Sequence, residues 1–343
     1  MALKKLALLI FALALVGCGR EPLVKRESYV FGTRVEVQVW GEPQARADVA
    51  ADAVLREFDR LHRAYHAWQP SELTALNDAI AAGRPQTISA ELATLLRESA
   101  AFSAAGEYLF DPGVGGLVTL WGFHDDTFAP RLPDPERLKA LRVQHPSIAD
   151  LSLDGQTASS RNRALALDFG GYLKGVALDR AAEMLKAQGI RNAIINIGGN
   201  IMALGNKGGK PWRVGIQHPR EGGPMASLEL RDGEAIGTSG DYQRYFELEG
   251  KRYCHLIDPR SGAPAEGTQA VSILVPPGAR AGMRSDAGSK PLFIAGADWP
   301  RLASKLALTH VLRVDSQGQI EVTAALKARL RFEMSDLRVK ALP

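Results

Sequence analysis

Hydroxyl-bearing, ionisable and glycine residues are concentrated in two short stretches of the C-terminal half. Residues 238–242 read Thr-Ser-Gly-Asp-Tyr, and residues 252–262 read Arg-Tyr-Cys-His-Leu-Ile-Asp-Pro-Arg-Ser-Gly. Between them, residues 242–248 and 251–257 carry β-favouring residues on either side of a Glu-Gly pair, which is typical of a hairpin. Such a hairpin brings the two stretches together. A core strand does not need this chemistry, whereas a site for a phosphorylated ligand does.

Three glycine-rich stretches also have the composition of ligand-binding backbone. Residues 168–175 (Asp-Phe-Gly-Gly-Tyr-Leu-Lys-Gly) precede a predicted helix, whose free amide groups attract anions while Lys174 adds a point charge for phosphate. Residues 196–200 (Asn-Ile-Gly-Gly-Asn) and 110–115 (Phe-Asp-Pro-Gly-Val-Gly) are similar. A tight turn explains each stretch equally well or better when it is taken alone. Their combination in one chain favours a ligand site.

Three side chains near these stretches have both a structural and a chemical interpretation. Asp286, at the start of a predicted helix, is typical of a helix cap. His255 is either a structural histidine or a base, since imidazole titrates near neutral pH. Cys254 is adjacent to it, but neighbouring residues of a strand point to opposite faces. Cys254 is therefore predicted to be buried and inert.

The surrounding elements predict an α+β fold with a mixed or antiparallel sheet flanked by helices. Strands are expected at 29–40, 164–169, 190–197, 212–217, 227–231, 234–238 and 271–275, with a hairpin around 316–319. Helices are expected at 45–64, 90–104, 176–188, 285–294 and 299–308. Residues 111–123 are predicted to be irregular, and residues 130–146 to form a surface excursion.

The N-terminus has the pattern of a bacterial lipoprotein signal. Two lysines precede an apolar stretch at residues 6–16, which is too short to span a bilayer and is followed by Gly-Cys. We expect residues 1–17 to be a signal peptide, with Cys18 the lipidated first residue of the mature chain. Residues 18–28 are then a tether and residues 29–343 the folded domain. An ordinary signal peptide followed by a chance cysteine is the alternative.

Whole-chain composition sets further limits. The net charge is +4, from 42 basic and 38 acidic residues without a basic run, which argues against nucleic-acid binding. The chain has only two cysteines, so no intramolecular disulfide can form once Cys18 carries lipid. A lipidated protein is expected on the extracytoplasmic side of a bacterial membrane, facing the periplasm.

The ordered series of motifs resembles the ApbE family, bacterial FAD:protein FMN transferases that are often lipoproteins. The series is Phe-Gly-Thr at 31–33, Ser-Glu-Leu-Thr-Ala-Leu-Asn at 71–77, Phe-Asp-Pro at 110–112, Leu-Trp-Gly-Phe at 120–123, and the stretches 168–175, 196–200, 238–242 and 255–262. Several members are weak signals alone, whereas their combination is specific. The resemblance implies an α+β fold of the ApbE type, related to the T-fold.

The resemblance also implies a Mg²⁺-dependent reaction with FAD as substrate. A Thr or Ser hydroxyl of a target flavoprotein attacks the FMN phosphorus, AMP leaves, and FMN stays attached through a phosphoester bond. Such a reaction needs alignment and charge neutralisation more than covalent catalysis. The acceptors implied by the family are subunits of Rnf or Na⁺-translocating quinone reductase complexes, or secreted flavoprotein reductases.

Site residues follow from the resemblance, position by position. His255 is the implied general base, with Asp258 and then Asp241 as further carboxylates. The positions expected to contact FAD are Phe31 (Met in the usual motif), Trp68, Phe110, Asp111, Pro112, Asp168, Lys174, Thr238 and Leu256. The metal positions are Asp286, the main chain at Gly171, and residue 290.

Residue 290 departs from the family pattern. The family has Asp and Thr four residues apart on one helix face for Mg²⁺, whereas residues 285–290 here read Ser-Asp-Ala-Gly-Ser-Lys. A protonated Lys290 cannot ligate Mg²⁺ and repels it. One outcome is that Lys290 points away while Ser289 or water completes the metal shell. A second is that its ammonium replaces part of the metal's charge and holds the pyrophosphate. A third is that the chain binds flavin without transferring it. In the last case the protein is a membrane-anchored flavin carrier.

Overall fold

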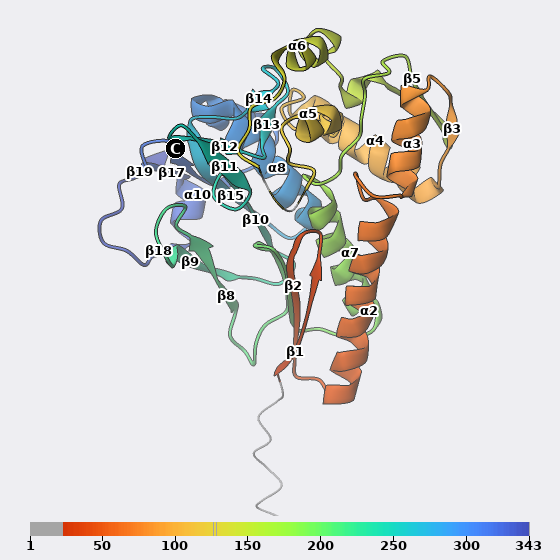
Figure 1. Cartoon of the computed structure of the whole chain (residues 1–343). Coiled ribbons are helices and arrows are strands. Elements are labelled where there is room, and N and C mark those ends of the chain that lie inside the picture. The colour runs from red at the N-terminus through yellow and green to blue at the C-terminus, as the bar shows by residue number, and fades with distance from the viewer. Residues whose placement is uncertain (1–22, 126, 128, 343) are drawn as a thin grey trace, which may run out of the picture.

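A central mixed sheet organises the molecule. The computed structural model describes residues 23–342 except 126 and 128, so the predicted signal peptide and Cys18 lie outside the described residues. Within that part, nine strands form the sheet in the order β1 (Leu23–Val30), β2 (Thr33–Trp40), β6 (Ala193–Ile197), β7 (Asn200–Leu204), β10 (Ala235–Gly240), β15 (Thr268–Val275), β16 (His310–Asp315), β17 (Ile320–Thr323) and β19 (Val339–Leu342). Neighbours are antiparallel except for β17 and β19. The predicted α+β class is confirmed (Figure 1).

Three long helices cover one face of this sheet: α2 (Gln44–Ala64), α7 (Leu173–Ala187) and α8 (Ala281–Ala295). Helix α2 buries residues at three- and four-residue spacing, among them Val54, Phe58 and Leu61, as an amphipathic helix does. Helix α8 packs against α7, β10 and β15 and is buried almost all round. Its polar side chains therefore face other protein groups or the site, not bulk solvent.

The remaining elements lie around this frame. The other helices are α3 (Glu72–Ala81), α4 (Ala90–Ala105), α5 (Gly115–Leu120), α6 (Pro135–Gln144), α9 (Trp299–Lys305) and α10 (Ala324–Lys327). The smaller sheets are β8 (Trp212–Gln217), β9 (Pro224–Leu230) and β18 (Leu330–Phe332); β4 (Leu151–Asp154), β5 (Thr157–Ser160) and β3 (Gln86–Thr87); β11 (Tyr245–Leu248) with β12 (Lys251–Cys254); and β13 (Ile257–Asp258) with β14 (Ala263–Pro264). No helix among the described residues is long and apolar enough to cross a bilayer.

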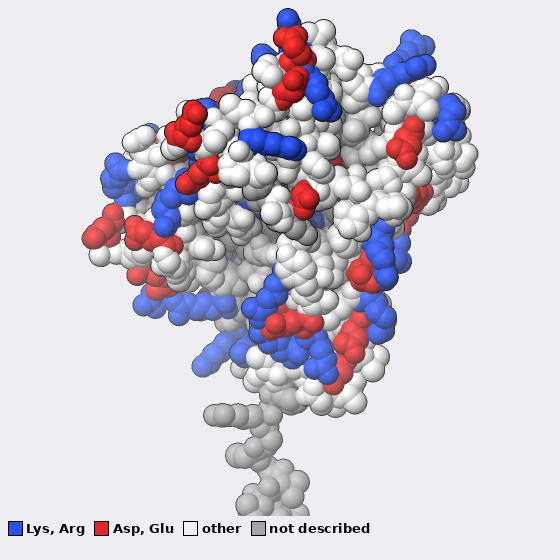
Figure 2. Space-filling view, in the orientation of Figure 1, with Lys and Arg blue, Asp and Glu red and all other residues white. Residues whose placement is uncertain are grey.

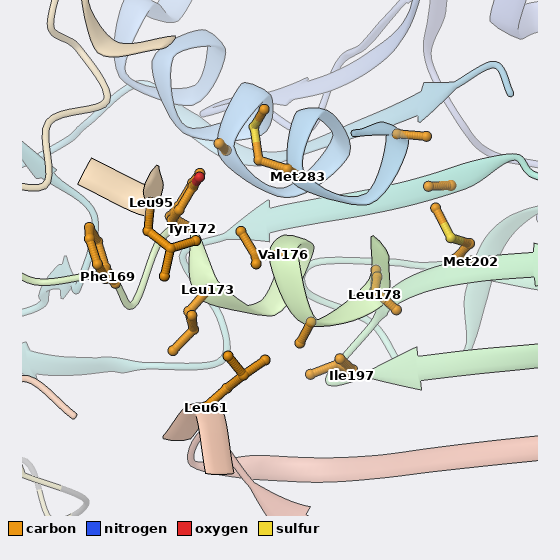
Figure 3. Packing of buried hydrophobic residues seen from close by; sticks show 14 of the residues in the cluster. Leu61, Leu95, Phe169, Tyr172, Leu173, Val176, Leu178, Ile197, Met202 and Met283 are labelled. Carbon is orange, nitrogen blue, oxygen red and sulfur yellow. The ribbon is translucent and has the colours of Figure 1, made fainter. Parts of the chain in front are cut away.

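Helix α7 lies within the largest hydrophobic core. Figure 3 shows Val176 and Leu178 of α7 close to Leu61 of α2, Met283 of α8 and Ile197 of β6. On the other face of the central sheet, a second core forms against β8 and β9. The two cores hold the sheet from both sides, so the loops at its edge stand on rigid elements.

The tether predicted for residues 18–28 is wrong from residue 23 onward. Residues 23–28 belong to β1, which pairs with β2 along its whole length and buries Val24 and Val30. The segment is polar because β1 is an edge strand, and charged side chains on an edge oppose pairing with other chains. The single strand predicted at 29–40 is likewise divided by a tight turn at Phe31 and Gly32, whose φ angles are 58° and 66°.

Two other sequence expectations need correction. The strand predicted at 164–169 is a single bridge between Val114 and Ala166, because the segment bonds to a loop and not to a sheet. The irregular segment at 111–123 contains the short helix α5. In contrast, the hairpin predicted around the Glu-Gly pair is confirmed as β11 and β12, and the surface excursion at 130–146 contains the exposed helix α6.

Candidate active site

A cavity of about 960 Å³ opens where the turn after β1, the end of α2, the start of α7, β10 and α8 meet. Its volume is in the range of small-molecule and cofactor sites. The sequence-predicted residues that line it are Phe31, Trp68, Phe110, Asp111, Asp168, Gly171, Lys174, Thr238, His255, Leu256 and Lys290. Segments far apart in the sequence are thus brought to one cavity. On the face in Figure 2, charges of both signs are interspersed, without an extended basic patch.

Four residues expected in the site do not line the cavity, namely Pro112, Asp241, Asp258 and Asp286. The carboxylate of Asp258 accepts hydrogen bonds from the main chain and the guanidinium of Arg260 at 2.8–3.2 Å, so it organises its own turn. The Pro112 carbonyl accepts from the Asp168 amide at 2.8 Å and positions that residue. Asp241 is also occupied elsewhere, because it pairs with Arg220.

His255 has the geometry of a neutral base. Its Nδ1 lies 3.1 Å from the main-chain oxygen of Arg244. A carbonyl oxygen only accepts, so Nδ1 carries the proton and Nε2 keeps its lone pair. Burial, the Arg244 guanidinium and the Lys174 ammonium lower the pKa of His255 to about 3. The imidazole is therefore uncharged at neutral pH, and three cations, Arg244, Lys174 and Lys290, act on it.

Beside His255 on the sequence, Cys254 is buried, as predicted. Burial raises the pKa of its thiol to about 12. The thiol is accordingly protonated, and it lies 3.8 Å from the Leu256 main-chain oxygen. Cys254 has a packing role and no nucleophilic one.

Asp286 and Lys290 form an ion pair within α8, four residues apart. The Lys290 ammonium contacts the Asp286 carboxylate and lies 2.8 Å from the Asp286 main-chain oxygen. The carboxylate also accepts from the Gly175 amide at 2.8 Å and the Asn200 side-chain amide at 3.1 Å. Burial lowers the pKa of Lys290, and the Asp286 carboxylate opposes that effect. The carboxylate is thus bonded on several sides, and only the lysine of the pair reaches the cavity wall.

Two further carboxylates line the cavity and hold loops in place. Asp111 accepts from the amides of Gly113 and Ile148 at 2.7 and 2.8 Å and also from the Ser147 hydroxyl. Asp168 accepts from the Gly170 amide at 2.7 Å. Burial is the largest influence on each and raises the pKa of both carboxyl groups. Asp111 is saturated by its own loops, so Asp168 is the better placed of the two to meet a ligand.

Aromatic side chains form part of the cavity wall. Phe31 sits at the left-handed turn position and its ring is 5.5 Å from that of His62. A bulky residue at positive φ is uncommon, and such strain is concentrated at functional sites. Trp68, on the loop after α2, has the Arg244 guanidinium 5.8 Å from its ring centroid. These groups offer flat surfaces of the kind that a conjugated ring system packs against.

Three polar residues that support the site were assigned no individual role from the sequence, although Asn200, Ser239 and Ser289 each lie in a stretch singled out above. Asn200 is buried in β7, bonds to Asp286, and also accepts from the Thr238 amide at 3.3 Å. The Ser239 and Ser289 hydroxyls lie 2.6 Å apart and join β10 to α8. Polar residues within otherwise apolar buried elements were the available signal, but their partners are distant in the sequence.

Fold and geometry together define a class: an α+β protein whose deep cavity suits a ligand with an aromatic ring and phosphate groups. A family model described as the ApbE family matches residues 31–312. An FAD:protein FMN transferase of Rhodobacter capsulatus is 43% identical over 310 residues, which are 90% of this chain and 58% of that relative. One from Haemophilus influenzae is 30% identical over 333 residues, which are 92% and 94% of the two chains.

A solved structure agrees with these sequence matches. The ApbE protein from Thermotoga maritima has a TM-score of 0.81 and 29% identity, covering 90% of this chain and all of that one. The chain therefore belongs to the ApbE family. It spans 58% of the length of the Rhodobacter capsulatus relative.

Proposed function

We propose that this protein transfers the FMN portion of FAD to a Thr or Ser hydroxyl of an acceptor flavoprotein and releases AMP. The observation that carries the proposal is the neutral imidazole of His255 in a cavity with aromatic and cationic walls. Membership of a family whose relatives are FAD:protein FMN transferases supports the same activity. FAD is accordingly the proposed substrate, and a flavoprotein is the proposed partner.

The proposed step is a displacement at phosphorus. The acceptor hydroxyl oxygen forms a bond to the FMN phosphorus while the pyrophosphate P–O bond breaks, and AMP takes the bonding electrons. The hydroxyl proton passes to Nε2 of His255. The ammonium groups of Lys174 and Lys290 neutralise part of the negative charge of the phosphates. Bound pyrophosphate also weakens the cationic field that depresses the pKa of His255, so substrate binding makes the imidazole a stronger base.

Magnesium, which the family resemblance implies, does not fit the arrangement of donors in this structure. Mg²⁺ requires near-octahedral oxygen ligands, whereas the Asp286 carboxylate is bonded to Gly175, Asn200 and Lys290. Across the described residues, no group of three His, Cys, Asp or Glu side chains is arranged to hold a metal ion. No step of the transfer is therefore assigned to the ion, and Mg²⁺ dependence stays a prediction to be measured.

The competing function is a flavin carrier that binds FAD without cleaving it. The ion pair at Asp286 favours this alternative only if a metal is indispensable for transfer. The two functions differ in their products. Incubation of the detergent-solubilised protein with FAD and the flavin-carrying domain of a Na⁺-translocating quinone reductase, followed by chromatography of the nucleotides, separates them. Release of AMP supports the transferase, and recovery of intact FAD alone supports the carrier.

For cellular location, we propose a lipid anchor at Cys18 with the folded domain on the extracytoplasmic side of the membrane. Support comes from the sequence alone, namely the two lysines, the apolar stretch and the Gly-Cys step. Such a location would place the site beside extracytoplasmic redox proteins, the acceptors that the family implies. Labelled palmitate incorporated into the parent but not into Cys18→Ala would support the anchor.

A further inference from the structure

The cation in the Asp286–Lys290 pair is the member that faces the cavity. Lys290 lines the cavity although only 8% of its surface is exposed, whereas Asp286 is completely buried and does not line it. The two residues are four apart on α8, and the ammonium lies 2.8 Å from the Asp286 main-chain oxygen as well as against the carboxylate. A ligand in the cavity therefore meets the Lys290 side chain of this ion pair, not the Asp286 carboxylate.

The ammonium is held by a rigid support. Gly175 donates its amide to Asp286 at 2.8 Å, and Asn200 donates its side-chain amide at 3.1 Å. Helices α7 and α8 approach so closely that a Cβ on Gly175 would lie 2.5 Å from the Gly282 main-chain oxygen. Since neither helix can shift without breaking this contact, the carboxylate is fixed in place. It fixes the ammonium in turn, as preorganised electrostatic stabilisation requires.

The surroundings of the ammonium match those of a phosphate subsite. The aliphatic part of Lys290 runs beside Gly171, where an added Cβ would lie 3.4 Å from Lys290 Cε. Lys174, at the start of α7, lines the same cavity as Lys290, so two lysine side chains border one space. Two cations near one glycine-rich backbone turn repel each other when the cavity is empty. An anionic ligand relieves this repulsion.

We propose that the Lys290 ammonium, held by Asp286, contacts the pyrophosphate of FAD directly and takes the part of a divalent cation. The proposal rests on the proposed function, because it concerns the same FAD site. FAD binding then needs no added metal, because the Lys290 side chain occupies the position at which a Mg²⁺ ion would otherwise contact the phosphates. Removing the lysine both weakens the phosphate contact and frees the Asp286 carboxylate for a metal.

The test is FAD affinity, measured by quenching of flavin fluorescence, in EDTA and in excess Mg²⁺. The parent is expected to bind FAD with affinities that agree within about twofold in the two buffers. Lys290→Thr is expected to weaken binding in EDTA about tenfold or more, the loss expected for a hydrogen bond to a charged group. Mg²⁺ is expected to restore part of that loss. Lys290→Met keeps the volume but supplies no oxygen ligand beside Asp286, so it should lose affinity and recover less of it with Mg²⁺ than Lys290→Thr does.

The experiment needs a control variant at a lysine that is far from the Asp286–Lys290 pair in the sequence. Lys186→Thr changes an exposed lysine in the last turn of α7 and should leave both affinities unchanged. Parent protein that binds FAD only with Mg²⁺ overturns the proposal but leaves the transferase function standing. Parent protein that binds no FAD in either buffer overturns both. If the Lys290 variants fail to fold, the FAD affinity of the parent in EDTA and in excess Mg²⁺ tests the proposal by itself.

Discussion

Neutralising Asp286 should destabilise the fold far more than removing its partner. Asp286 is completely buried and Lys290 is 8% exposed, so Asp286→Asn leaves a buried ammonium without its counter-charge. Breaking a buried pair in this way costs about 3–5 kcal/mol. Lys290→Met instead leaves the carboxylate with its bonds from Gly175 and Asn200. It should cost about 1–2 kcal/mol, because two charge-assisted hydrogen bonds remain.

Urea unfolding followed by tryptophan fluorescence measures this asymmetry. With an m-value of about 3 kcal/mol/M, the Asp286→Asn midpoint should fall by about 1 M or more at unchanged m. Asp298→Asn is the matched control, since its pair with Arg301 is exposed and its loss should leave the urea midpoint essentially unchanged. An Asp286→Asn stability within about 1 kcal/mol of the parent, or a larger loss in Lys290→Met, would contradict a buried ion pair held in this way.

Two further predictions concern a base and a helix start. His255→Gln should lower the transfer rate about 10²–10⁴-fold while FAD still binds. Because the pKa of His255 in the folded protein is about 3, the acid limb of the kcat/KM profile should lie well below pH 6.5. For the same reason the free energy of unfolding should decrease as pH falls from 6.5 toward 3. An acid limb near pH 6.5 would contradict the effect of burial and the neighbouring cations on His255. Asp179→Ala removes the acceptor of the Gly282 and Met283 amides at the start of α8. Thermal unfolding should therefore show a free energy of unfolding lower by about 2–5 kcal/mol than the parent's, and Asp179→Asn should lie between the parent and Asp179→Ala. Equal melting temperatures for the parent and Asp179→Ala would contradict this role.

Local patterns predicted much of the frame that carries the site. The Glu-Gly hairpin and the helix expected at 45–64 follow from spacing and turn chemistry, and the structure confirms them as β11 with β12 and as α2. The hairpin also brings Thr238 and His255 to one cavity, as expected. These features depend on neighbours in the sequence, which is why they are visible without a structure.

The choice of partner by a charged side chain was not predictable in the same way. Asp286 was interpreted as a helix cap, but α8 begins at Ala281, where Asp179 of α7 accepts from the first amides. Asp286 is therefore in mid-helix and pairs with Lys290. Asp258 was expected in the site but is bound by Arg260, two residues along the chain. No local pattern states which of several possible partners a charged group selects.

The most direct test of the central claim is the intact mass of an acceptor domain after incubation with this protein and FAD. We expect a gain equal to one FMN, with AMP released in equal amount, and loss of both in His255→Gln. An acceptor of unchanged mass, with FAD bound and uncleaved, would contradict the transferase function and leave a flavin-binding protein.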